Sequence, residues 1–191
     1  MGLARRRADR NGLNPMPGIG IKKTLAMTVT FLEMRAKAPM LPPPQPKGKI
    51  AILRAEKPPI HFYRYLYNTI GGDYYWVDRR KMDDASVEAI VHDPEVELYV
   101  LNVDGCPAGM AELDFRDAHT GLIAYFGLMP EYIGKRLGYF FLYHAVANAW
   151  ARPISTLLVN TCTLDHPRAL ALYQRVGFKP YSREDRMVEL P

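Results

Sequence analysis

The sequence GKRLG, at residues 134–138, is the first stretch of this 191-residue chain whose residue types suggest chemistry. Its two glycines let the backbone curl so that successive N–H groups point inward. A helix that begins at such a turn adds its own unpaired N–H groups and the positive end of its dipole. The loop therefore suits a phosphate or pyrophosphate group, although a turn that binds nothing accounts for the same residues equally well.

Two elements must position this loop. Apolar and aromatic residues from Leu122 to Leu128 predict a strand, and Pro130 ends it because proline cannot donate a backbone hydrogen bond. A long apolar helix is expected from about Gly138 to Trp150. The loop thus joins a strand to a helix, an arrangement in which backbone N–H groups gather around an anion.

A second stretch, at residues 155–181, predicts a strand, a loop, a helix and a further strand. Taken together, the two stretches resemble the GNAT superfamily of acyl-CoA-dependent N-acyltransferases. The superfamily's first motif, V-x-P followed by Q or R and a G-x-G-x-G or G-x-G-x-A loop, is matched between Leu128 and Gly138. Its later motif, A-x-x-L-Y-x-x-x-G-F, is complete between Ala169 and Phe178.

Two positions depart from the first motif. Ile133 stands where the superfamily usually has Gln or Arg, and Arg136 replaces the middle glycine. Members of the superfamily carry a side chain at either place and keep the loop, so the resemblance implies weakened rather than abolished phosphate capture. Arg136 could itself supply a positive charge to the phosphates.

The resemblance implies an α+β fold of the GNAT type, with helices flanking a mixed, mostly antiparallel central sheet. Residues 96–103 and 108–116 predict a hairpin with Asp104-Gly105 as its turn. Residues 155–160 predict a strand parallel to the one before the loop. In the superfamily these two strands splay apart and leave a cleft for the pantetheine arm of the cofactor.

By the same resemblance, acetyl-CoA is the cosubstrate. The splayed strand would pair with its pantetheine amides, the amide near Leu128 would polarise the acetyl carbonyl, and residues 133–138 would hold the pyrophosphate. Asp165 or His166 falls where the superfamily often has an Asn that contacts the cofactor. The predicted cofactor-binding residues are Gly127, Leu128, Met129, Ile133, Gly134, Lys135, Arg136, Leu137, Gly138, Asp165, His166 and Tyr173.

Two residues are predicted to move protons. Tyr173 matches the motif tyrosine that protonates the departing thiolate in many GNAT enzymes, and a phenol with a pKa of about 10 suits a leaving thiol with a pKa of about 8.5. Packing beside the cofactor is its alternative role. Glu112, on the strand next to the central one, is the predicted general base for the incoming ammonium, unless it lies in solvent at a strand end. Asp114 falls on the same face and is expected to be a base or a substrate anchor.

The acceptor site is expected between the first two strands of the GNAT domain, where the superfamily forms one wall of this site. Residues 58–70 predict a helix opened by proline, and its rings either line the pocket or pack the helix onto the sheet. Asn160 either positions substrate or makes a hydrogen bond at a strand end. The predicted substrate-binding residues are Asp114, Tyr63, Tyr67, Trp76 and Asn160; Tyr74 and Tyr75 belong to the same aromatic cluster.

Composition places the chain among ordinary globular proteins, with 48% hydrophobic and 24% charged residues. No apolar run reaches the roughly 20 residues that span a bilayer, so a cytoplasmic protein without membrane partners is expected. The histidines and cysteines lack metal-ligand spacing, and no metal is expected. Cys106 and Cys162 are expected to be reduced, buried thiols.

The formal net charge of +5 comes from the N-terminal residues. Residues 1–24 contain six of the 25 basic residues and one of the 20 acidic residues, which leaves 19 of each for the rest of the chain. A nucleic-acid-binding face needs positive charge clustered on the folded domain. A nucleic-acid partner is therefore not expected, and the basic segment is interpreted as a solvated leader.

The predicted organisation has three parts. A basic flexible leader (1–24) precedes an additional N-terminal strand with a Pro-rich spacer (25–48), and the GNAT acyltransferase domain occupies 49–191. The spacer cannot form a helix or a central strand. We interpret it as a stiff linker that wraps an edge strand onto the sheet, with a PxxP ligand for a partner as the alternative.

The resulting hypothesis is an N-acetyltransferase that moves an acetyl group from acetyl-CoA to a primary amine by direct transfer in a ternary complex. Neither cysteine has a neighbouring His or basic residue in sequence to activate it, which argues against a covalent intermediate. The alternative is a non-catalytic or regulatory acyl-CoA-binding module. A small cationic amine, an amino acid, a peptide N-terminus or a lysine all fit as acceptor, and the oligomeric state is not determined by the sequence.

Overall fold

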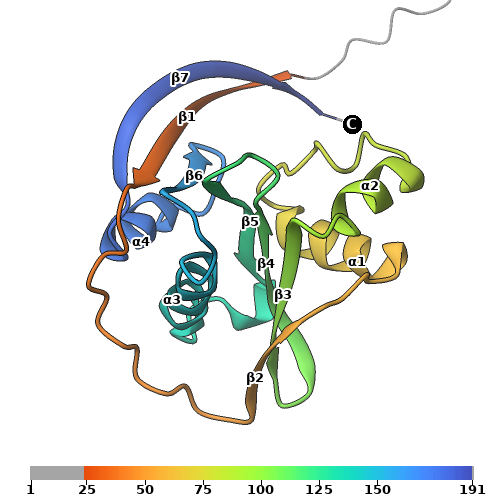
Figure 1. Ribbon diagram of the computed structural model, residues 1–191. Coiled ribbons are helices and arrows are strands. Elements are labelled where there is room, and N and C mark those ends of the chain that lie inside the picture. The colour runs from red at the N-terminus through yellow and green to blue at the C-terminus, as the bar shows by residue number, and fades with distance from the viewer. Residues whose placement is uncertain (1–23, 191) are drawn as a thin grey trace, which may run out of the picture.

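The computed structural model describes residues 24–190, in which seven strands form one mixed sheet flanked by four α-helices (Figure 1). The strand order is β2-β3-β4-β5-β6-β1-β7, and all neighbours are antiparallel except the parallel pair β5 and β6. This confirms the expected α+β architecture. The elements are β1 (Thr24–Met34), β2 (Ile50–Arg54), α1 (Ile60–Gly71), α2 (Asp84–Val91), β3 (Val96–Val103), β4 (Cys106–Asp114), β5 (Thr120–Leu128), a 3-10 turn (Pro130–Tyr132), α3 (Leu137–Ala149), β6 (Thr156–Cys162), α4 (Ala169–Arg175) and β7 (Lys179–Glu189).

Turn chemistry sets the β3–β4 hairpin, as the sequence predicted. Asp104 and Gly105 both have positive φ, at 51° and 88°, the conformation that a tight two-residue hairpin turn requires and that Asp-Gly adopts readily. The hairpin places Glu112 of β4 opposite Leu98 of β3, in the middle of the sheet.

Helices α1 and α2 cover one face of the sheet. The buried residues of α1 recur with helical spacing at Tyr63, Leu66, Tyr67 and Ile70, so they form one apolar stripe. This stripe packs with α2 and with the inner residues of β3 and β4 in one core cluster. The side chain of Asp83 accepts a 2.9 Å hydrogen bond from the Ser86 amide and caps α2.

Helices α3 and α4 cover the opposite face. In α3, Phe141, Leu142 and Val146 have no exposed surface, which explains why that helix is apolar on most of its circumference. Phe126 of β5 packs against Phe141 in a tilted arrangement, with ring centroids 5.3 Å apart. The glycine at 127, the next residue along β5, faces the other way, because a Cβ there would lie 2.3 Å from Ile70 of α1.

Strands β5 and β6 separate after a short parallel pairing. Their register runs from Thr120 opposite Thr156 to Ile123 opposite Val159 and ends there. β5 continues to Leu128 and β6 to Cys162, so the carboxyl halves of both strands diverge, as the resemblance implied. A free strand edge in this position can pair with an extended ligand.

The N-terminal strand is an interior strand, which corrects the prediction that it lies at an edge. β1 pairs with β6 on one side, from Val29 opposite Cys162, and with β7 on the other, from Thr24 opposite Glu189. Residues 24–28 therefore extend beyond β6 and pair with β7 alone. We call this extension together with the next pair, Val29 and Glu184, the ribbon (residues 24–29 and 184–189). The ribbon arches over β5 and β6 on the side opposite α3 (Figure 1).

The spacer between β1 and β2 runs past the N-terminal end of α3. The Tyr139 hydroxyl donates a 2.7 Å hydrogen bond to the Leu41 carbonyl. The predicted leader, except for Thr24, lies outside the described residues. Cys106 and Cys162 are free thiols, but Cys106 is exposed at the hairpin turn, so the expectation of a buried thiol was wrong there. None of the described helices is long and apolar enough to cross a membrane.

Candidate active site

A cavity of about 760 Å³ opens where β5 and β6 diverge. One wall is the half of β5 that no longer pairs with β6, residues 124–128, and the lining also includes Asn160 and Cys162 of β6. The loop 133–138, α4, the segment 74–78 and the ribbon also contribute to the wall. The cavity is thus built by segments far apart in the sequence.

The phosphate-suited loop bends at two residues of positive φ. Gly134 has φ 84° and Arg136 has φ 63° with ψ 18°, a left-handed conformation immediately before α3. Arg136 occupies the place of the motif's middle glycine and adopts a conformation natural to glycine. Both residues line the cavity, and the first N–H groups of α3 have no partner within the helix. Backbone donors, a helix N-terminus and a guanidinium therefore meet on this side.

Tyr173 lies in the cavity wall between two aromatic rings. Its ring centroid is 6.4 Å from that of Phe126 and 6.1 Å from that of Phe178, and only 7% of its surface is exposed. Burial raises the pKa of Tyr173 above its usual value, and the nearby Asp165 carboxylate raises it further. The phenol therefore keeps its proton throughout the neutral pH range.

Asp165 and His166 both line the cavity, and each already has a protein partner. Asp165 accepts hydrogen bonds from the Thr161 hydroxyl at 2.7 Å and the Cys162 amide at 2.9 Å. His166 Nδ1 accepts one from the Arg168 amide at 3.1 Å. These bonds shape the turn between β6 and α4.

Most of the predicted cofactor residues line this one cavity. Met129 and Lys135 do not: Met129 is buried with the α1 face of the core, and the Lys135 ammonium lies 4.8 Å from the centre of the Tyr132 ring. The predicted residues in the cavity wall are Gly127, Leu128, Ile133, Gly134, Arg136, Leu137, Gly138, Asp165, His166 and Tyr173.

Glu112 lies outside the cavity wall, fully buried in a charged network. Its two carboxylate oxygens accept a 2.6 Å hydrogen bond from the Tyr63 hydroxyl and a 2.8 Å hydrogen bond from the Arg79 guanidinium. Burial alone would lower the pKa of Arg79, but the Glu112 carboxylate outweighs it and raises that pKa, so the guanidinium stays charged. The same guanidinium lies 5.2 Å from the centre of the Tyr125 ring.

Of the other residues predicted to bind the acceptor, some line the cavity and some do not. Trp76 and Asn160 line the cavity, as do Tyr74 and Tyr75. Tyr67 is buried behind Trp76, with ring centroids 5.4 Å apart. Asp114 lies at the far end of β4 and binds the Arg116 guanidinium through both oxygens, at 2.6 to 3.1 Å.

Sequence reasoning missed four residues that line the cavity: Met27, Asp78, Tyr125 and Arg186. Asp78 lies in the loop after α1, and its carboxylate is 3.5 Å from the Tyr125 hydroxyl. Tyr125 belonged to the predicted central strand but was assigned no role. Met27 and Arg186 come from the ribbon, far from either motif. The alternation of β5 was the one signal that could have placed Tyr125, since it shares a face with Gly127.

A free strand edge, a positive-φ loop at a helix start and a phenol therefore lie in one cleft. A model of the acetyltransferase (GNAT) family matches residues 63–178, more than half of the chain. The chain belongs to the GNAT acetyltransferase family. A search of curated proteins found no match.

Solved structures support the same fold. A GCN5-related N-acetyltransferase from Sphaerobacter thermophilus is similar with a TM-score of 0.62 and 17% identity over 86% of this chain and 52% of that one. One from Kribbella flavida has a TM-score of 0.59 and 18% identity over 87% and 60%. AAC(6')-Iy, solved with a CoA-containing bisubstrate analogue, has a TM-score of 0.53 and 17% identity over 69% and 92%. The chain spans between 52% and 62% of the length of four of its structural relatives.

Proposed function

We propose that the protein is an N-acetyltransferase that moves an acetyl group from acetyl-CoA to a primary amine by direct transfer in a ternary complex. The observation that carries this proposal is the single cavity shared by the unpaired edge of β5, the 133–138 loop and Tyr173. An alternative is a non-catalytic acyl-CoA-binding module on the same fold. Tyr173 at the cavity wall favours the enzyme, since binding alone does not need a proton donor there.

The residues of the cleft fit acetyl-CoA. The backbone of residues 124–128 has a free edge for the pantetheine amides, and the absence of a side chain at Gly127 lets Ile70 and Trp76 lie directly against the strand. The loop amides, Arg136 and the start of α3 would hold the pyrophosphate. Arg168 and Arg175 also line this side of the cavity and add positive charge for the nucleotide phosphates.

Acetyl transfer forms an amide C–N bond and breaks the thioester C–S bond. The amine must lose a proton, and the departing sulfur must gain one or remain a thiolate. The Leu128 region would donate a backbone hydrogen bond to the acetyl oxygen as charge develops on it. Tyr173 would donate its phenolic proton to the sulfur.

On the acceptor side, two carboxylates are candidates for receiving the amine. Glu112 stays a prediction as the general base, but both of its oxygens are occupied by Tyr63 and Arg79. We assign Glu112 the task of fixing Arg79, and through it the Tyr125 ring. Asp78 lines the cavity itself, so we propose that it holds the incoming ammonium.

The decisive experiment is calorimetric titration with acetyl-CoA of the wild type, Gly134→Asp and Gly105→Asp. Both glycines have positive φ, at 84° and 88°, and a Cβ at either would meet no atom within 4 Å. The two variants therefore add the same charge and similar backbone strain, but only Gly134 lines the cavity.

We expect wild-type binding in the micromolar range, retention in Gly105→Asp and at least about a tenfold loss in Gly134→Asp. No binding by the folded wild type would overturn the proposal. Equal loss in both variants would show that the loop is not the phosphate site. A Tyr173→Phe variant that binds acetyl-CoA normally and lowers kcat about 10²-fold or more would separate the enzyme from the binding module.

A further inference from the structure

The ribbon lies outside the matched family region, at residues 24–29 and 184–189, yet four of its side chains line the cavity. Val188 is buried whereas its neighbour Met187 is 62% exposed, so alternate residues of β7 face the cavity and the solvent. Arg186 is two residues from Val188 and faces the cavity with it. The ribbon residues in the cavity wall are Met27, Val29, Arg186 and Val188.

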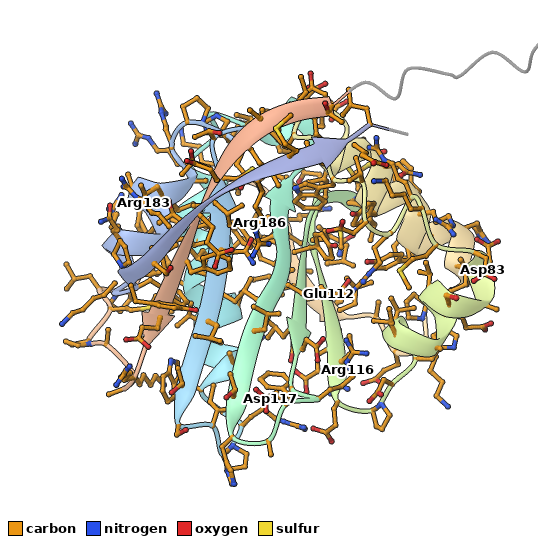
Figure 2. All side chains as sticks on the ribbon, turned by 90° about the horizontal axis from the view of Figure 1, so that it is seen from above. Asp83, Glu112, Arg116, Asp117, Arg183 and Arg186 are labelled. Carbon is orange, nitrogen blue, oxygen red and sulfur yellow. The ribbon has the colours of Figure 1, made fainter. Side chains whose placement is uncertain are left out.

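Arg186 is on the acceptor side of the sheet rather than the phosphate side. The phosphate loop leads into α3, which lies across β5 and β6 from the ribbon (Figure 1). Figure 2 shows Arg186 close beneath the ribbon where the ribbon crosses in front of β5 and β6. Arg136, Arg168 and Arg175, by contrast, belong to the loop and to α4. A pyrophosphate held by the loop would therefore not be bound by Arg186.

The guanidinium of Arg186 is oriented but not fully used. Its Nε and Nη2 groups donate to Glu184 at 3.0 and 2.5 Å, and it lies 5.2 Å from the centre of the Phe31 ring. Arginine has five donors, so further donors remain for an anion. The pair with Glu184 is half exposed on both sides, and exposed pairs of this kind are weak. An anion bound at Arg186 can therefore compete with Glu184.

A carboxylate and apolar side chains line the acceptor part of the cavity together with Arg186. Asp78 supplies a carboxylate beside the Tyr125 hydroxyl, and Trp76 and Met27 supply apolar area. A ligand that matches all three features has an ammonium, an apolar side group and an anionic group. That combination is the chemistry of a free amino acid.

We propose that the ribbon makes this protein selective for a free amino acid with an apolar side chain, whose carboxylate binds Arg186 while its α-ammonium meets Asp78. This inference rests on the proposed acetyltransferase function and narrows its acceptor. The ribbon is then the specificity-determining wall of the site. The ammonium gives one proton to solvent before the amide C–N bond forms, and the nitrogen loses a second proton to solvent when it forms. The departing sulfur gains one proton from Tyr173, which solvent then replaces, and the carboxylate takes no part in the bond changes.

The experiment first screens the twenty standard amino acids as acceptors with acetyl-CoA. The best acceptor is then compared with its amide and with its decarboxylated amine, which keep the side chain and the primary amine but lack the carboxylate. If phenylalanine is best, the matched compounds are phenylalaninamide and phenethylamine. The variants are Arg186→Gln, Arg186→Lys, Asp78→Asn and the control Arg183→Gln.

Arg183 is the matched control because it lies on the same strand three residues away, does not line the cavity and points to the other face; both arginines are labelled in Figure 2. We expect Arg186→Gln to lower kcat/KM for the amino acid about 10- to 100-fold and to leave the amide and the amine unchanged. Arg186→Lys should recover part of the loss, and Arg183→Gln should have no effect. Asp78→Asn should affect all three compounds alike, because all carry the ammonium.

Equal wild-type activity on the amino acid and its decarboxylated amine would overturn the inference, as would an Arg186→Gln effect shared by all three compounds. Acetylation of none of the twenty amino acids would also overturn it. The proposed function fails separately, in the calorimetric titration, if the wild type does not bind acetyl-CoA. A protein that binds acetyl-CoA and acetylates amines without regard to the carboxylate would keep its function and lose only this inference.

Discussion

The Tyr63 hydroxyl donates a 2.6 Å hydrogen bond to Glu112, a carboxylate with no exposed surface. Arg79 neutralises the same carboxylate from α1's side of the sheet, at 2.8 Å. A helix, a loop and a central strand are thus joined by one buried charged pair. Burial first, and then Glu112, raise the pKa of Tyr63, so this phenol is a fixed hydrogen-bond donor and not a titrating group at neutral pH.

Glu112→Gln should destabilise the fold by about 3–5 kcal/mol, because it leaves the buried guanidinium of Arg79 without its counter-charge. Chemical denaturation would measure the change in the free energy of unfolding. Glu184→Gln is the comparison, since its pair with Arg186 is half exposed and should contribute less than about 1 kcal/mol. A loss for Glu112→Gln as small as that for Glu184→Gln would show that the network does not stabilise the fold.

The kinetics of the same Glu112→Gln variant would separate its two candidate roles. Because we assign it the task of fixing Arg79 and Tyr125, we expect a higher KM for the acceptor amine and an unchanged acidic limb in the pH profile of kcat. Steady-state rates measured over a range of pH would test this. Loss of the acidic limb with a large fall in kcat would instead establish Glu112 as the general base.

Arg136→Gly should have two effects: it should relieve backbone strain in the loop, and it should weaken cofactor binding. A side chain in the left-handed conformation is disfavoured by about 1–2 kcal/mol, so glycine at φ 63° should leave the free energy of unfolding unchanged or raise it by up to about 1 kcal/mol. Loss of the guanidinium should weaken acetyl-CoA binding roughly 3- to 10-fold. Arg136→Lys, which keeps both charge and strain, should change neither strongly. Undiminished affinity in Arg136→Gly would mean that Arg136 does not reach the phosphates.

Tyr173→Phe should reduce the slope with which the free energy of unfolding falls as pH rises in the alkaline range. Burial raises the pKa of Tyr173, and Asp165 adds to this, so above the ordinary tyrosine value of 10.0 the folded state holds a proton that the unfolded state has released. Stability then falls as pH rises, by up to about 1.4 kcal/mol per pH unit for each such group. The variant should lose one group's share of this slope in urea denaturation between pH 9 and 11. An identical slope in wild type and variant would contradict a raised pKa.

Gly127→Ala should clash where Gly138→Ala does not. A Cβ at 127 would lie 2.3 Å from Ile70 of α1, whereas one at 138 would lie 3.5 Å from Leu172, an ordinary contact. Overpacking of this kind typically costs about 1–3 kcal/mol, so thermal denaturation should show a lower Tm for Gly127→Ala only. Equal Tm values would mean that α1 moves away from β5 without resistance.

Local chemistry was the part of the fold that the sequence could predict. Asp104-Gly105 predicted its hairpin because the turn needs positive φ at both positions, and Pro130 marked the strand end because it lacks an N–H group. The loop at 134–138 and Tyr173 were found through motifs whose spacing is kept by a strand and a helix. All residues of that loop except Lys135 line one cavity together with Tyr173.

The depth at which a side chain is buried and the pairing of strands far apart in the sequence could not be predicted from the sequence. Alternation along β4 showed that Glu112 and Asp114 share a face, but not that the first is buried beneath α1 while the second meets Arg116 at the sheet's margin. β1 looked like an edge strand because its partners, β6 and β7, lie more than a hundred residues away. Arg186 was missed for the same reason. The face of β7 that carries it lines the cavity only because the ribbon crosses the cleft.

The interior place of β1 has a consequence for how the chain is assembled. Its neighbours are residues 156–162 and 179–189, so the strand synthesised first among the described elements finds its partners last. Pairing over such separations slows folding and leaves apolar strand residues unpaired in the meantime. The hairpin β3–β4 and helix α1 can form early, whereas β7 is held to the sheet only through β1. Release of β1 would therefore detach the final strand and open the part of the cleft that the ribbon lines in a single event.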